Sequence, residues 1–114
     1  MTGFRPLEQF EFHHTLDGTP GVSVVMFSAR GCGACRSFKS MLEDYQQQHP
    51  DLHLFLVDAE RDGALVREFD VFHLPALFLF VDGRYHRPLQ CEARPEAFAA
   101  ALGAARAAPA LEAP

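Results

Sequence analysis

The chain has 114 residues, enough for one compact domain and too few for two separate hydrophobic cores. Hydrophobic residues make up 48% of it and aromatic residues 11%, so a core can form without a structural metal or a disulfide framework. The net charge of −5, with no run of Lys or Arg, argues against a nucleic-acid partner, and no apolar run is long enough to span a membrane.

The amino-terminal segment carries two conflicting patterns. Residues 1–6 lack the charged region and the apolar stretch of a signal peptide, which predicts a cytoplasmic protein. Beyond them, the alternation from Phe10 to Leu16 is typical of a strand, whereas the spacing of Leu7, Phe10 and His14 is typical of a helix. Both assignments stay open for this segment.

A strand followed by a helix is predicted next. The turn sequence Asp17–Gly21 precedes a continuous apolar run, Val22–Ser28, of the kind found in strands buried on both faces. After Cys32-Gly33-Ala34-Cys35, apolar residues recur at helical spacing until Pro50. These helical residues are Phe38, Met41, Leu42 and Tyr45. The two cysteines therefore lie where a strand leads into a helix.

A second strand and helix follow, and then a β-hairpin. Leu52–Asp58 is a second buried strand, and Gly63–Phe69 carries apolar residues in helical register. Ala76–Val81 is a third strand. The dipeptide Asp82-Gly83 after it is favoured in two-residue type I′ turns, so the next strand must return antiparallel.

The carboxy-terminal part contains an edge strand, a helix and a tail. Arg84–Gln90 is the returning strand, and Pro88 within it lacks a backbone N–H, which predicts a position at the edge of the sheet. Pro95 suits the first position of a helix that continues to about Arg106. Ala108–Pro114 is rich in Ala and Pro and is predicted to be a disordered tail.

The element order predicts one α/β domain over residues 1–107, with three layers formed by a mixed central sheet and helices on both of its faces. Three motifs in it resemble the thioredoxin family: Cys32 to Cys35 at a helix start, Val57 to Ala59 at a strand end, and Val71 to Ala76 ahead of the hairpin. The resemblance extends from Val22 to about Leu102. It implies a thioredoxin-like fold and thiol–disulfide oxidoreductase activity.

By this resemblance, Cys32 is the nucleophile and Cys35 is the resolving thiol. The position of the pair suits these roles, because unpaired N–H groups and the dipole at a helix amino terminus stabilise a thiolate. Cys35, one turn further on, can attack the mixed disulfide at Cys32 and release reduced substrate. The dithiol carries the electrons, so no cofactor is expected. The expected partners are protein or small-molecule disulfides, together with a reductase or a low-molecular-weight thiol.

The resemblance also implies a substrate-binding surface beside the cysteines. In the family, the proline that matches Pro75 is cis, and the residue before it, here Leu74, offers backbone groups to an extended peptide. Gly33 and Ala34, which lie between the cysteines, are expected to belong to the same surface.

Four residues depart from the family pattern. Gly31 stands where thioredoxins usually have tryptophan, and Ala34 replaces the proline between the cysteines, which predicts a more open and less rigid site. Met26 and Leu54 stand where the family has a buried aspartate and its lysine partner. A proton acceptor for Cys35 is therefore missing, and we expect slower turnover unless water or another group serves.

Four further residues are candidate modulators, each with a simpler structural alternative. As a cation, His73 would favour the thiolate of Cys32, but it also fits an exposed loop position. Cys91 could trap a mixed disulfide or be regulatory, but the simpler interpretation is a small, partly buried apolar residue. Arg30 and Arg36 could lower the pKa of Cys32 or steer acidic partners, or they could be ordinary solvated residues.

Two other functions are compatible with the sequence. The departures from the family pattern fit a peptide-binding or assembly module with little turnover. Exposed Cys-x-x-Cys thiolates could also carry a soft metal ion such as Cu(I). The histidines show no spacing that would complete a metal site with the cysteines, so no resident metal is expected.

Overall fold

The computed structural model describes residues 3–114, in which strands and helices alternate along the chain. Their order is β1 (Phe4–Pro6), α1 (Phe12–Asp17), β2 (Val22–Ser28), α2 (Gly33–Gln48), β3 (His53–Asp58), α3 (Gly63–Glu68), β4 (Ala76–Val81), β5 (Arg84–Leu89) and α4 (Pro95–Ala107). Residues 1 and 2 lie outside the described part. Two predictions involve these residues: that the domain starts at residue 1 and that residues 1–6 are not a signal peptide. Both therefore lie partly outside the described residues.

A single mixed sheet forms the middle layer, with the strand order β1-β3-β2-β4-β5. β1, β3 and β2 run parallel, whereas β4 is antiparallel to β2 and β5 is antiparallel to β4. Asp82 and Gly83 have φ values of 52° and 81°, as a type I′ turn requires, and this confirms the hairpin. β5, which contains Pro88, lies at one edge, as predicted from the missing donor.

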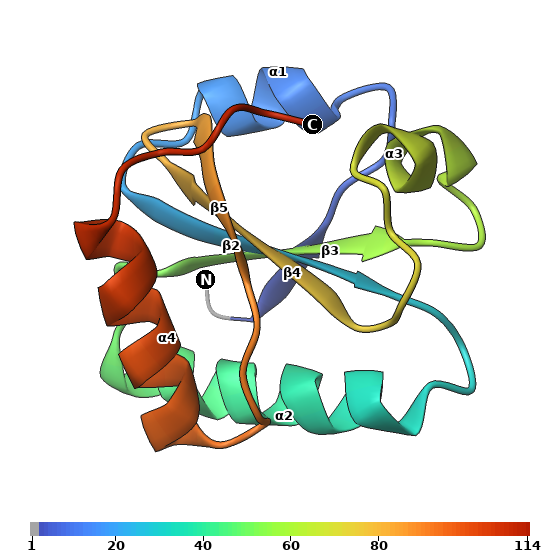
Figure 1. The fold of residues 1–114 in the computed structure, drawn as a ribbon. Helices are drawn as coiled ribbons and strands as arrows, with labels where there is room; N and C mark the ends of the chain where they lie inside the picture. The colour runs from blue at the N-terminus through green and yellow to red at the C-terminus, as the bar shows by residue number, and fades with distance from the viewer. Residues whose placement is uncertain (1–2) are drawn as a thin grey trace.

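Helices cover both faces of this sheet, with α2 and α4 on one and α1 and α3 on the other (Figure 1). The continuous apolar runs in β2 and β4 explain the arrangement, because alternate residues of each strand point to opposite faces. Val24 and Met26 pack in the core beneath α2 and α4, whereas Val25 and Phe27 pack beneath α1 and α3. The three-layer α/β fold is therefore confirmed.

The amino-terminal segment resolves into a three-residue strand and a short helix. β1 pairs in parallel with β3, and α1 begins only at Phe12. Leu7, Phe12 and Leu16 are buried, whereas Phe10 is 91% exposed. Both alternative patterns relied on Phe10 as an inward-facing residue, and this is why neither identified the correct boundaries.

Residues 108–111 contact His86 and Arg87 of β5, in a segment for which the sequence predicts a disordered tail (residues 108–114). The backbone N–H of Leu111 donates to the carbonyl of His86 over 2.8 Å, and the Arg87 guanidinium donates to the carbonyl of Pro109 over 2.8 Å. Nε2 of His86 lies 2.9 Å from the carbonyl oxygen of Ala108.

Among residues 3–114, no helix is both long and apolar enough to cross a bilayer.

Candidate active site

The loop that leads from β2 to Cys32 and the loop that carries Pro75 lie at the carboxyl end of β2, and Cys35 follows in the first turn of α2 (Figure 1). The register of the sheet explains this placement. Phe27 of β2 pairs with Ala76 of β4, so Pro75 lies at the same end of the sheet as the loop that leads to Cys32. This end of the sheet joins residues that are more than forty positions apart in the sequence.

The cysteine pair occupies the first turn of α2. Cys32 is the N-cap residue, and its Sγ accepts a hydrogen bond of 3.1 Å from the backbone N–H of Cys35. The two residues form a disulfide, with their Cα atoms 5.2 Å apart. Cys32 is half-buried, whereas Cys35 is only 4% exposed. The more exposed cysteine is therefore at the positive end of the helix dipole, where a thiolate is favoured, and the second cysteine is buried.

The loop ahead of β4 lies at the same end of the sheet as the cysteine pair. The Leu74-Pro75 peptide bond is cis, as the family resemblance implied, and both residues are half-buried. Gly33 and Ala34 are exposed. Phe72, which sequence reasoning passed over, is 84% exposed in the same loop. Only the structure shows that this aromatic side chain faces solvent.

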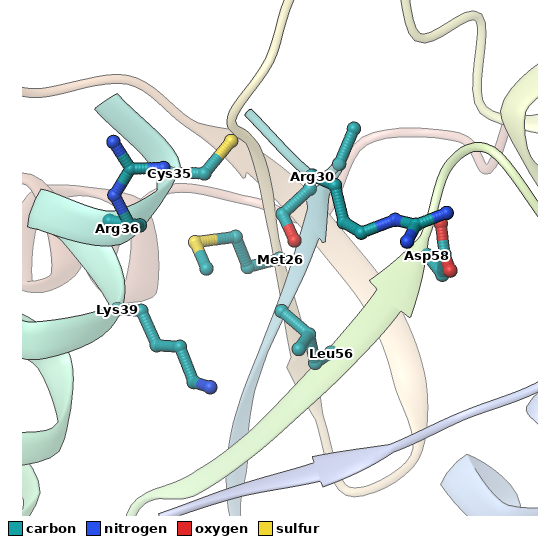
Figure 2. Close-up of a pocket in the computed structure, with 9 residues that line it drawn as sticks. Met26, Arg30, Cys35, Arg36, Lys39, Leu56 and Asp58 are labelled. Carbon is teal, nitrogen blue, oxygen red and sulfur yellow. The ribbon is translucent and has the colours of Figure 1, made fainter. Parts of the chain in front are cut away.

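A cavity of about 280 Å³ lies beneath Cys35, between α2 and the ends of β2 and β3 (Figure 2). Its lining includes Met26, Arg30, Cys35, Arg36, Lys39, Leu56 and Asp58. Met26 is fully buried and, with Leu56, supplies apolar wall. The charged groups come from the helix, from the loop before it and from the end of β3.

The register between β2 and β3 determines which side chain lies beside Met26. Met26 pairs with Leu56, whereas Leu54 pairs with Val24, one step further from the cysteines. The residue opposite Met26 is therefore Leu56, and Leu54, which the resemblance places at the family's lysine position, lies two residues earlier on β3. Side chains two apart on a strand share a face, so the apolar character expected there is the same.

The candidate modulators lie around this edge. His73 is exposed in the loop before Pro75, and both line a second cavity, of about 410 Å³, that Pro114 also lines. Arg30 and Arg36 are exposed and line the cavity beneath Cys35. Of the four candidate modulators, only Arg30 and Arg36 line the cavity beneath Cys35, whereas His73 and Cys91 do not.

Cys91 follows the end of β5, at the same edge of the sheet as Pro75, because Leu89 pairs with Leu77 near the start of β4. It is a free, half-buried thiol that packs against the core under α2 and α4. Burial raises the pKa of the Cys91 thiol, and the negative charge of Glu92 adds to this. Within residues 3–114, no three His, Cys, Asp or Glu side chains come together as a metal site would require.

Sequence reasoning also missed Lys39 and Asp58 as neighbours of the cysteines. The spacing between Cys35 and Lys39 was an available signal, since residues four apart in a helix lie on the same side. The place of Asp58 follows only from the pairing of β3 with β2, in which Asp58 lies opposite Ser28.

Comparisons with known proteins agree with this geometry. The family model described as Thioredoxin matches residues 4–104. Thioredoxin-1 of Saccharomyces cerevisiae is 30% identical over 84 residues, which cover 74% of this chain and 79% of the relative. Other relatives are named as chloroplastic in Arabidopsis thaliana and as mitochondrial in Schizosaccharomyces pombe.

Solved structures show the same fold. Oxidised mitochondrial thioredoxin 3 of Saccharomyces cerevisiae superposes with a TM-score of 0.75 at 22% identity, covering 89% of this chain and 94% of that one. Thioredoxin f2 of Chlamydomonas reinhardtii superposes with a TM-score of 0.78 at 18% identity, covering 90% and 95%. Together with the family match over residues 4–104 and the cysteine pair at the start of α2, these results show that the chain belongs to the thioredoxin family.

Proposed function

We propose that this protein is a thiol–disulfide oxidoreductase in which Cys32 attacks a disulfide of a protein or a small molecule and Cys35 completes the exchange. The observation that carries the proposal is the unequal pair at the start of α2: Cys32 is accessible and caps the helix, whereas Cys35 is buried behind it. Membership of the thioredoxin family supports this chemistry in general.

The exchange proceeds in two steps. The Cys32 thiolate attacks one sulfur of the substrate, so the substrate S–S bond breaks, a mixed disulfide forms and the other substrate sulfur leaves as a thiolate. Cys35 then loses its proton and attacks Sγ of Cys32, which closes the intramolecular disulfide and expels the second substrate sulfur. The substrate gains two electrons and two protons, and the dithiol loses them. The dithiol needs no bound cofactor, but a reductase or a low-molecular-weight thiol must reduce the pair again.

Loop residues beside the cysteines would hold the substrate. Leu74 and Pro75 lie at the edge reached by the loop to Cys32, and Gly33 and Ala34 are exposed between the cysteines. The small side chains at positions 33 and 34 leave backbone accessible to an extended peptide. A cytoplasmic location stays a prediction, since relatives are named for other compartments.

Single-cysteine variants test the proposal. Reduction of a disulfide-bonded protein is followed with dithiothreitol as electron donor. We expect Cys32→Ser to abolish catalysed reduction and Cys35→Ser to accumulate a mixed disulfide at Cys32, visible by mass spectrometry. Cys91→Ser is the matched control and should turn over as the parent does. Equal rates for Cys32→Ser and the parent would refute the assignment.

Peptide docking without turnover is a second candidate, favoured by Phe72, whose side chain is 84% exposed in the loop before Leu74. A double variant, Cys32→Ala with Cys35→Ala, distinguishes the two functions. A docking module would bind an extended peptide in this variant as tightly as in the parent, and Phe72→Ala would weaken that binding. If the protein is an oxidoreductase, removing both cysteines should greatly weaken substrate binding, because its complex with the substrate is a covalent mixed disulfide.

A further inference from the structure

The sequence Ala108-Pro109 ends α4 and turns the chain toward β5. The residue before a proline is restricted to extended backbone, and Ala108 has φ −81° and ψ 154°. Nε2 of His86, in β5, lies 2.9 Å from the carbonyl oxygens of both Ala105 and Ala108, which fixes the point where the chain leaves the helix. Residues 109–114, which we call the strap, then cross β5, as the red end of the ribbon in Figure 1 shows.

Two hydrogen bonds hold the strap on β5, and both come from neighbouring residues of that strand. The backbone N–H of Leu111 donates to the carbonyl of His86, and the Arg87 guanidinium donates to the carbonyl of Pro109, each over 2.8 Å. The register between β4 and β5 shifts at His86, as in a β-bulge, which leaves the extra residue unpaired with the partner strand. The strap therefore uses a backbone carbonyl that the sheet leaves free at its edge.

The far end of the strap reaches the cavity of about 410 Å³ beside Pro75, which we call the Pro75 groove. Pro114 lines this groove together with His73 and Pro75, both from the loop before β4. Aromatic side chains form another part of the lining: Phe72, Phe78 and Tyr85. Aromatic-lined grooves are typical docking sites for extended segments that contain proline. The strap and an extended peptide that approaches Pro75 therefore meet in the same groove.

We propose that the strap is an autoinhibitory segment, which in its docked position competes with the extended peptide of a protein substrate for the Pro75 groove. This proposal rests on the proposed oxidoreductase function. The strap acts on peptide binding alone, and the exchange at Cys32 and Cys35 is the same with and without it. A protein disulfide must displace the strap, whereas a small disulfide that reaches only Cys32 need not.

The docked strap is held weakly enough to be displaced. Its residues are exposed, and the Leu111 side chain is 46% exposed, so little apolar burial opposes the entropy lost when the strap is ordered. Attachment to α4 favours docking, because a tethered segment has a high effective concentration at a nearby site. We expect roughly two to nine docked molecules for each open one, which would slow capture of a protein substrate about three- to tenfold.

The kinetic test compares a protein disulfide with a small one. The reduced protein is mixed with insulin or with hydroxyethyl disulfide, and the loss of its thiols is followed by quenched alkylation and mass spectrometry. Because only open molecules accept the protein substrate, deletion of residues 109–114 should raise the second-order rate constant for insulin about three- to tenfold. The rate constant for hydroxyethyl disulfide should stay unchanged.

Arg87→Met applies the same test with every residue of the strap present, because it removes only the side chain that donates to Pro109. The rate constant for insulin should rise in this variant too. Arg84→Met is the matched control: it removes a positive charge from the same strand, and the exposed Arg84 side chain forms no hydrogen bond or ion pair within residues 3–114. Parent rates in both the deletion variant and Arg87→Met, or an equal rise in Arg84→Met, would overturn the proposal.

Hydrogen exchange tests the docking itself, whether or not the protein reduces disulfides. The Leu111 amide is protected only while the strap is docked, so NMR should show it exchanging with water about three- to tenfold more slowly than an unstructured amide, and faster again in Arg87→Met. The Glu112 amide, which forms no backbone hydrogen bond within residues 3–114, is the internal reference and should exchange alike in both proteins.

The two measurements separate failure of the strap from failure of the function. An unprotected Leu111 amide in the parent would refute docking of the strap and, with it, the autoinhibition. A parent that reduces neither insulin nor hydroxyethyl disulfide would refute the oxidoreductase function instead.

Discussion

Replacing Met26 with aspartate would place a carboxyl group in the buried wall beneath Cys35. Met26 is 0% exposed and pairs with Leu56 in the sheet. Removing the buried methionine forfeits roughly 1.5–3 kcal/mol of apolar burial, and an unpartnered neutral carboxyl adds a desolvation cost of about 1–3 kcal/mol. Met26→Asp should therefore lower the free energy of unfolding by about 4 kcal/mol even where the new carboxyl is protonated.

The same variant should acquire a pH dependence that the parent lacks at this position. Below about pH 4 the new carboxyl is protonated in both states, and only the packing loss appears. Above it, the unfolded chain ionises while burial keeps the folded carboxyl neutral, because its folded pKa is raised. The free energy of unfolding should then fall by up to about 1.4 kcal/mol per pH unit until the folded pKa is reached.

Urea unfolding of the parent and of Met26→Asp, repeated between about pH 3 and pH 8, measures this difference. A difference between parent and Met26→Asp that is constant with pH, or smaller than about 1 kcal/mol, would refute the description of Met26 as a buried residue in an apolar wall.

Three further predictions concern positions away from the disulfide. Gly83→Ala should lower the free energy of unfolding, measured in urea, by about 3 kcal/mol or more. The φ angle of Gly83 is positive, and a Cβ there would collide with the carbonyl oxygen of Leu16 and lie 2.9 Å from Cα of Asp17. A loss below about 1 kcal/mol would contradict this. Ser23→Ala should stabilise the fold by about 1 kcal/mol, since the buried Ser23 hydroxyl has no hydrogen-bond partner within residues 3–114, and a destabilised variant would contradict this. In oxidised protein, Cys91 should react with iodoacetamide with a pH midpoint above that of an ordinary thiol, because burial raises its pKa, and an ordinary midpoint would show an accessible thiol.

Local pattern was sufficient to predict the central elements of this fold. The apolar runs Val22–Ser28 and Ala76–Val81 match β2 and β4, because a strand buried on both faces has no polar alternation to obscure it. β1 was missed because Phe4–Pro6 is too short to carry a pattern and becomes a strand only through its pairing with β3. The hydrogen bonds between residues 108–111 and β5 likewise depend on contacts that no local pattern encodes.

The site was predictable where its residues form a contiguous motif. The cysteine pair follows from the strand–helix junction, but the residues around Cys35 depend on how β3 is registered against β2. Leu54 and Leu56 share a face of β3, so sequence pattern alone does not show which of the two lies opposite Met26. Lys39 was overlooked because its position on α2 fits an ordinary exposed helical residue.

The redox potential of the Cys32–Cys35 pair tests the central claim most directly. Purified protein is equilibrated in glutathione buffers of graded ratio, the free thiols are alkylated, and the two redox forms are quantified by mass spectrometry. An exchange-active pair should show one two-electron transition between about −270 and −120 mV, the range of cellular thiol–disulfide oxidoreductases, and Cys91→Ser should leave it in place. A pair that stays oxidised below about −300 mV would behave as a structural disulfide and would contradict the account.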